Sequence, residues 1–216
     1  MSEIKAIIFD CDGTLLDTER IYMGTWSTVA REMGYEIPQD VLTDTRGKSG
    51  AYIRQRFYGA LGDDFPFEEI DKIRMPLNEK IFYETKDVVK PGVENLLKWC
   101  KENGIKLAVA SAKHIQITSD HLKHGKIYDK FDAVLGGNMV TRNKPEPDLF
   151  LKAAEELGIP SEKCIVMGDA TSDMKAAKAA GMRAFFIPDL VPIDEEIESI
   201  AEKILNQIDE VIPYIN

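Results

Sequence analysis

Apolar positions along the chain follow two patterns, short uninterrupted runs and longer stretches with helical spacing. Residues 5–9 form the first apolar run, which ends directly in the polar sequence Asp-Cys-Asp-Gly and therefore predicts a buried strand. Later apolar runs predict strands at residues 106–110, 133–135, 164–167 and 184–187. Helical spacing predicts helices at residues 93–103, 115–124, 147–157, 172–180 and 195–206. Strands that alternate with helices are typical of a parallel α/β sheet.

One segment near the N-terminus departs from this alternation. It contains no strand pattern, and helical spacing predicts helices at residues 19–33, 50–61 and 67–84. Gly34 follows the first of these helices at a position where helices commonly end. We therefore expect an α/β core formed by residues 1–15 and 88–216, with an all-helical cap inserted at residues 16–87.

Composition and charge exclude several classes of function. The chain has 216 residues, of which 44% are hydrophobic, enough for a sizeable core. No apolar run approaches the roughly 20 residues of a membrane span, and the N-terminus lacks the layout of a signal peptide. The net charge of −10 repels nucleic acids and anionic membranes. We expect neither as a partner.

The three cysteines are Cys11, Cys100 and Cys164. Their odd number and wide spacing argue against a disulfide framework or a thiolate zinc site. A reducing cytoplasm is the simplest location for such a chain.

Polar side chains follow the predicted strands, where ligands bind in open parallel sheets. Asp10 and Asp12 follow the first strand, Ser111 follows the second, and Asp169 follows the strand at residues 164–167. Paired carboxylates are costly unless a cation lies between them, and oxygen donors without His or Cys suit Mg²⁺. The Ser111 hydroxyl and the Lys144 ammonium are suited to hold phosphoryl oxygens.

Four motifs occur in a fixed order along the chain. They are Asp-x-Asp-Gly-Thr at 10–14, Ser111, Lys-Pro-x-Pro-Asp at 144–148 and Gly-Asp-x-x-x-Asp at 168–173. In this order they resemble the haloacid dehalogenase-like superfamily, in its phosphatase and phosphomutase branch with a helical cap. The resemblance covers essentially the whole chain and implies a Rossmann-like core with a cap that closes over the site.

The resemblance also implies roles for individual residues. Asp10 would be the nucleophile that forms a phosphoaspartate, and Asp12 the general acid and base. The expected phosphate-binding residues are Ser111, Ala112 and Lys144. The expected Mg²⁺ ligands are Asp10, Asp12 through its backbone carbonyl, Asp169, and Asp173 directly or through water.

A phosphatase acting on a small metabolite, such as a sugar phosphate, is the function we expect. A β-phosphoglucomutase-like isomerase is the alternative from the same branch, and a catalytically silent binding protein is the alternative from another class. Mutases of that type carry Gly-Val-Ser-Arg in the cap, Val in place of Thr14 and Glu-Asp as the fourth motif. Here the cap has Gly-Lys-Ser-Gly at 47–50, and Gly168 precedes Asp169. These departures favour a phosphatase.

Cap residues Arg46 and Lys48 are candidates to contact an anionic substrate, although ordinary solvated charge explains them equally well. Cys11 lies between the two aspartates, but strand alternation directs its side chain away from them, which favours core packing. His121 and His124 share a helix face without an evident third ligand, so we expect an exposed pair.

Overall fold

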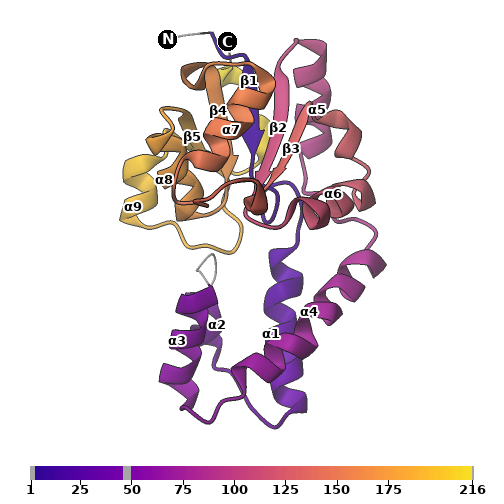
Figure 1. The fold of residues 1–216 in the computed structure, drawn as a ribbon, viewed down its shortest axis with the longest axis vertical. Helices are drawn as coiled ribbons and strands as arrows, with labels where there is room; N and C mark the ends of the chain where they lie inside the picture. The colour runs from indigo at the N-terminus through magenta and orange to yellow at the C-terminus, as the bar shows by residue number, and fades with distance from the viewer. Residues whose placement is uncertain (1–2, 46–49, 216) are drawn as a thin grey trace. The chain divides into compact units, whose positions relative to one another are not determined.

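The computed structural model describes residues 3–45 and 50–215 of the chain (Figure 1). Two compact units divide it: Met1–Asp17 with Val89–Asn216, and Thr18–Val88. The first unit is an α/β core and the second is all-helical in the part that the structure describes.

A six-stranded parallel sheet forms the centre of the α/β core. Its strands are β1 (Ala6–Phe9), β2 (Lys106–Ser111), β3 (Ala133–Gly136), β4 (Cys164–Gly168), β5 (Arg183–Phe186) and β6 (Lys203–Ile204). They lie in the order β3-β2-β1-β4-β5-β6, with every neighbouring pair parallel. This is a Rossmann-like order, and the crevice for ligands lies where the order reverses, beside β1.

Helices cover the sheet and bury its apolar residues. They are α5 (Val93–Glu102), α6 (Ile115–His124), α7 (Asp148–Leu157), α8 (Thr171–Ala179) and α9 (Glu195–Ile200). Short 3₁₀ helices span Tyr128–Lys130, Gly137–Met139, Ser161–Lys163 and Ile208–Tyr214. Ile8 of β1 packs in one cluster with Phe150 of α7 and Met174 of α8. Because β1 is buried along its whole length, it is apolar throughout.

The C-terminal prediction was partly wrong. A single helix was expected over residues 195–206, but α9 ends at Ile200, and Lys203–Ile204 then forms strand β6. Ala201 has an extended backbone (ψ 130°), which ends the helix. The backbone of Lys203 and Ile204 pairs with Phe185 and Phe186 of β5, whose edge would otherwise be unpaired.

The helical unit contains α1 (Glu19–Glu32), α2 (Gln39–Asp44), α3 (Gly50–Leu61) and α4 (Phe67–Glu84). The sequence patterns predicted three of these helices and missed α2, whose six residues are too few to show helical spacing. Gly34 follows α1 with a φ of 85°, a left-handed conformation that glycine adopts at little cost. An aromatic cluster around Trp26, Phe57 and Phe67 forms the interior of this unit. Among the described residues, no helix is both long and apolar enough to cross a membrane.

Candidate active site

The carboxyl ends of three neighbouring strands bring the predicted motifs together. Phe9 of β1 lies opposite Val109 of β2 and Met167 of β4, so the residues that follow these positions meet at one edge of the sheet. Asp10 continues this alignment, because its backbone N–H donates to the carbonyl of Met167 at 2.8 Å. Ser111, at the end of β2, is 1% exposed. Residues more than 100 positions apart in sequence therefore share one small region.

Three carboxylates form a buried cluster in that region. Asp10, Asp169 and Asp173 each offer one oxygen, and these oxygens all lie within 4.8 Å of one another. The three residues are 8%, 5% and 2% exposed, respectively. Like charges this close repel unless a cation offsets them, and a set of oxygen donors alone fits a hard cation such as Mg²⁺. Three of the four predicted ligands, Asp10, Asp169 and Asp173, therefore lie close enough together to hold a metal ion.

Lys144 supplies a positive charge inside this cluster. Its Nζ lies 2.6 Å from Oδ1 of Asp10 and 2.7 Å from Oδ1 of Asp173, and its side chain is only 4% exposed. Burial alone would lower the pKa of this ammonium, but the carboxylates of Asp10 and Asp173 hold the pKa above its usual range. Lys144 is therefore a permanent cation next to the candidate nucleophile.

Asn143 holds the loop that carries Lys144, and the sequence analysis missed it. Its Oδ1 accepts from the backbone N–H of Lys144 at 2.9 Å, and its Nδ2 donates to the carbonyl of Ala112 at 3.1 Å. Ala112 and Lys144, which were both predicted to bind phosphate, are thus linked through one side chain. An Asn next to a motif lysine was the signal available in the sequence.

The pKa of Asp10 is raised to about 7 in the metal-free protein. Burial is the largest cause, the charges of Asp173 and Asp12 add to it, and Lys144 opposes it. A cation bound between these carboxylates would lower this pKa and favour the ionised form. The charge of Asp10 therefore depends on whether a cation is bound between these carboxylates.

Asp12 lies apart from the three-carboxylate cluster and pairs with Lys113. The Lys113 Nζ donates to Oδ1 of Asp12 at 2.7 Å, and the side chains of Asp12 and Lys113 are 15% and 27% exposed. The backbone N–H of Lys113 also donates to Oγ of Ser111 at 3.2 Å. Lys113 was not predicted, although its place two residues after Ser111 was a usable signal. The side chain of Asp12 is slightly more exposed than that of Asp10, at 15% against 11%.

Gly13 and Thr14 complete the turn after β1, and the neighbouring Asp169 explains the residue type at each position. Gly13 has a φ of 73°, and a Cβ at this position would lie 2.2 Å from a carboxylate oxygen of Asp169. The hydroxyl of Thr14 donates to Oδ1 of Asp169 at 3.2 Å. The Gly-Thr of the first motif therefore makes room for Asp169 and orients it.

Several other predictions have a clear outcome. Cys11 is 1% exposed, and burial, reinforced by Asp12 and Asp10, raises the pKa of its thiol well above the usual range, which confirms core packing. The expectation of an exposed histidine pair was wrong, because His121 is fully buried and His124 is half-buried. Arg46 and Lys48 lie outside the described residues.

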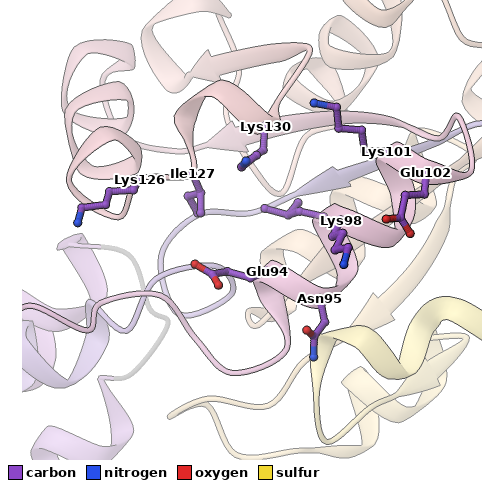
Figure 2. A pocket seen from close by; sticks show the side chains of 9 residues that line it. Glu94, Asn95, Lys98, Lys101, Glu102, Lys126, Ile127 and Lys130 are labelled. Atoms are coloured by element: carbon purple, nitrogen blue, oxygen red, sulfur yellow. The ribbon is translucent and has the colours of Figure 1, made fainter.

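A separate hollow of about 460 Å³ lies beside α5 and the segment after α6 (Figure 2). Lysines and glutamates surround it, with Leu97 and Ile127 among its lining residues. None of the candidate catalytic residues lines this hollow, so it is distinct from the carboxylate cluster.

Comparisons with known proteins lead to the same family as the four motifs. A family model described as haloacid dehalogenase-like hydrolase matches residues 7–187. A phosphoglycolate phosphatase from Nitrosospira multiformis is 31% identical over 189 residues, which are 86% of this chain and 83% of that protein. A phosphorylated carbohydrates phosphatase from Thermotoga maritima is 29% identical over 85% of this chain and 84% of that protein.

A solved structure extends the likeness to the whole fold. A β-phosphoglucomutase from Clostridium difficile has a TM-score of 0.76 and 27% sequence identity, and the match covers 98% of this chain and 95% of that one. The strand order, the four motifs at the sheet edge and these relatives lead to the same assignment. The chain belongs to the haloacid dehalogenase-like hydrolases, in their branch of phosphatases and phosphomutases.

Proposed function

We propose that this enzyme is a Mg²⁺-dependent phosphomonoesterase that acts on a small phosphorylated metabolite through an aspartyl phosphate on Asp10. The observation that carries the proposal is the buried contact between Asp10 and Lys144 at 2.6 Å, inside a cluster of carboxylates. A carboxylate beside a fixed cation can receive a phosphoryl group, whose oxygens the cation neutralises.

The residues have complementary roles in this reaction. An oxygen of Asp10 attacks phosphorus and displaces the ester oxygen, which takes a proton from Asp12. Asp12 then removes a proton from water, which attacks the phosphoaspartate and releases inorganic phosphate and free Asp10. Ser111, the Ala112 region and Lys144 would hold the phosphoryl oxygens during both steps.

The carboxylate cluster supports Mg²⁺ as the cofactor. Asp10, Asp169 and Asp173 would hold it, together with the backbone carbonyl of Asp12 that the family resemblance assigns to the site. Bound Mg²⁺ would neutralise charge on the phosphoryl oxygens and on the attacking carboxylate. Hydrogen bonds to Asp169 from Thr14 and to Asp173 from the N–H of Ala170 keep both carboxylates oriented.

The substrate class rests on the relatives and on charge. The relatives named above act on phosphoglycolate or on phosphorylated carbohydrates, according to their names. We propose a sugar phosphate or a similar small metabolite here, with residues 16–87 as a cap that excludes water and reads the leaving group. A reducing cytoplasm is the proposed location, supported by three free cysteines.

A panel of phosphate esters assayed with and without Mg²⁺ tests the proposal. We expect release of inorganic phosphate that stops in excess EDTA and returns when Mg²⁺ is added back. Full activity after exhaustive chelation would exclude the metal-dependent mechanism. Isomerisation of a sugar phosphate without release would indicate a mutase, and binding without either reaction would indicate a silent member of the family.

A further inference from the structure

A buried ion pair outside the carboxylate cluster contacts the loop that carries the candidate nucleophile. The Nζ of Lys90 lies 2.7 Å from Oδ1 of Asp189 and 2.5 Å from the carbonyl oxygen of Gly13. The Asp189 side chain is 2% exposed and that of Lys90 is 16% exposed. These three groups are separated by 77 and 99 positions along the chain, so no local pattern relates them.

The carboxylate of Asp189 is committed to this lysine. Within the described part of the chain, its second oxygen, Oδ2, is buried and has no hydrogen-bond partner. Burying an ion pair removes both charges from water, and apolar residues of similar size often stabilise a fold as well or better. A contribution to stability alone therefore does not explain the pair. Its effect on position does, because Asp189 holds the Lys90 ammonium against the Gly13 carbonyl.

The peptide that Lys90 contacts lies between two functional groups. On one side, Asp12 contributes the candidate acid and base, and on the other, Thr14 donates its hydroxyl to Asp169. Gly13 has a positive φ, and its N–H donates to the carbonyl of Leu16, so the turn is tightly folded. A hydrogen bond to the Gly13 carbonyl fixes the plane of the peptide that joins Gly13 to Thr14.

The backbone of Lys90 is held to the same turn. Its N–H donates to the carbonyl of Leu15 at 2.9 Å, and Leu16 forms an isolated bridge with Val89. The ammonium thus approaches Gly13 from a backbone that is already anchored one residue beyond Thr14. Such support is what orients the groups around a metal or a nucleophile in other proteins.

We propose that Lys90, aimed by Asp189, is a positioning residue that holds the Asp10–Thr14 turn in the geometry required for Mg²⁺ binding and phosphoryl transfer. The inference rests on the proposed function for its catalytic consequence, but the turn geometry and metal binding can be measured without turnover. Neither Lys90 nor Asp189 touches the reacting atoms in this proposal.

The test is the double variant Lys90→Met/Asp189→Asn, which removes both charges and leaves the net charge unchanged. The control is Lys106→Met/Asp132→Asn, which makes the same two substitutions at an exposed ion pair of 2.6 Å in the α/β unit. Isothermal titration with MgCl₂ gives the dissociation constant for Mg²⁺ in each protein. We expect about tenfold weaker binding or more in the Lys90 double variant, the usual effect of removing a supporting contact, and no change in the control.

Three further readouts separate positioning from electrostatics and from general stability. Lys90→Met alone removes a positive charge, so a purely electrostatic effect would strengthen Mg²⁺ binding, whereas loss of positioning weakens it. Hydrogen exchange should speed up for the amides of Gly13, Leu15 and Leu16 and not for those of β2 or β5. With p-nitrophenyl phosphate, kcat should fall more than KM rises.

Unchanged Mg²⁺ affinity and unchanged exchange in the double variant, or equal losses in the control, would overturn the inference. If the double variant does not fold, the single variant Asp189→Asn tests the inference, because it retains Lys90 but removes the charge that orients it. Wild-type Mg²⁺ affinity in Asp189→Asn would also overturn the inference. If the wild-type protein binds Mg²⁺ but hydrolyses no ester, the proposed function is contradicted. The Mg²⁺ titrations and hydrogen-exchange data would still test the positioning role of Lys90.

Discussion

At the scale of single residues, the site combines charges that would be unfavourable separately. Asp10, Asp173 and Lys144 are all nearly inaccessible to solvent, and each is tolerated because the others are present. The arrangement places one cation and several carboxylates in a volume of low dielectric, where their interactions are strong. Removing one of these charged groups therefore changes the electrostatic interactions of the other two.

Asp10→Asn should abolish turnover. The amide retains the shape of the side chain but cannot attack phosphorus, so phosphate release should fall roughly 10³-fold or more. The measurement is phosphate release from the best ester of the panel, with circular dichroism to verify the fold. Asp120→Asn, a change at an exposed ion pair with Lys123 outside the four motifs, is the control and should retain activity. Wild-type release by the Asp10 variant would exclude Asp10 as the nucleophile.

Mg²⁺ affinity should rise with pH up to neutrality. Because the metal-free pKa of Asp10 is about 7, a proton must leave this carboxyl when Mg²⁺ binds at lower pH. Affinity should therefore fall up to about tenfold per pH unit below about pH 6 and level off above about pH 8.

Calorimetry in two buffers of different ionisation enthalpy counts the released protons. We expect close to one proton per Mg²⁺ at about pH 6 and far fewer at about pH 8. Asp10→Asn is the control, since it lacks the titrating group and should lose this dependence. An affinity that is the same at both pH values would contradict the raised pKa.

At the scale of elements, the strand ends place the candidate site residues, and one aromatic cluster forms the interior of the helical unit. In the α/β core, β1 lies between β2 and β4, which is why their following residues converge. In the helical unit, Phe57 of α3 is fully buried, with its ring centroid 4.8 Å from that of Trp26 and 5.8 Å from that of Phe67. Aromatic packing links α1, α3 and α4 of this unit.

Phe57→Ala should destabilise the helical unit by about 3–5 kcal/mol, because it leaves a cavity among rings that cannot collapse completely. Urea unfolding followed by Trp26 fluorescence measures this, in a Trp99→Phe background so that only the helical unit is reported. Phe57→Leu is the matched control and should cost much less, since it retains most of the apolar volume. Equal midpoints for the Ala and Leu variants would show that Phe57 does not organise the unit.

At the scale of the whole molecule, an acidic chain acts on an anion. The net charge of −10 opposes the approach of a phosphate ester, so local cations must offset it. Lys144 and Lys113 lie at the candidate site, and Arg46 and Lys48 are two of the cations in the helical segment, the two named above as candidates for substrate contact. Substrate selection by the helical segment is the hypothesis that follows.

If Arg46 and Lys48 contact the leaving group, Arg46→Ala or Lys48→Ala should lower kcat/KM for the best natural ester and change the ranking of substrates. A small ester that does not reach the cap, such as p-nitrophenyl phosphate, should be affected much less. The comparison of kcat/KM for both esters in each variant is the measurement. Equal loss on both esters, or no loss on either, would show that these residues do not read the substrate.

The sequence by itself determined the α/β class and identified most residues of the candidate site, although not Lys113 or Asn143. Strand β1 is recognisable because a short apolar run meets Asp10 directly, and the four motifs keep their order along the chain. These are local properties, since the residues that define each one lie within a few positions of one another. The same locality explains why Gly34 and the ends of the longer helices could be predicted.

Only the tertiary structure decided which residues far apart in the sequence contact one another. Lys90 reaches Gly13 across 77 positions and Asp189 across 99, and Lys113 reaches Asp12 across 101. Strand β6 exists because the edge of β5 offers a partner to Lys203 and Ile204, and His121 is buried because α6 packs on β3. Hydrogen bonds, burial and sheet pairing act between neighbours in space, and the order of residues along the chain does not state which neighbours those are.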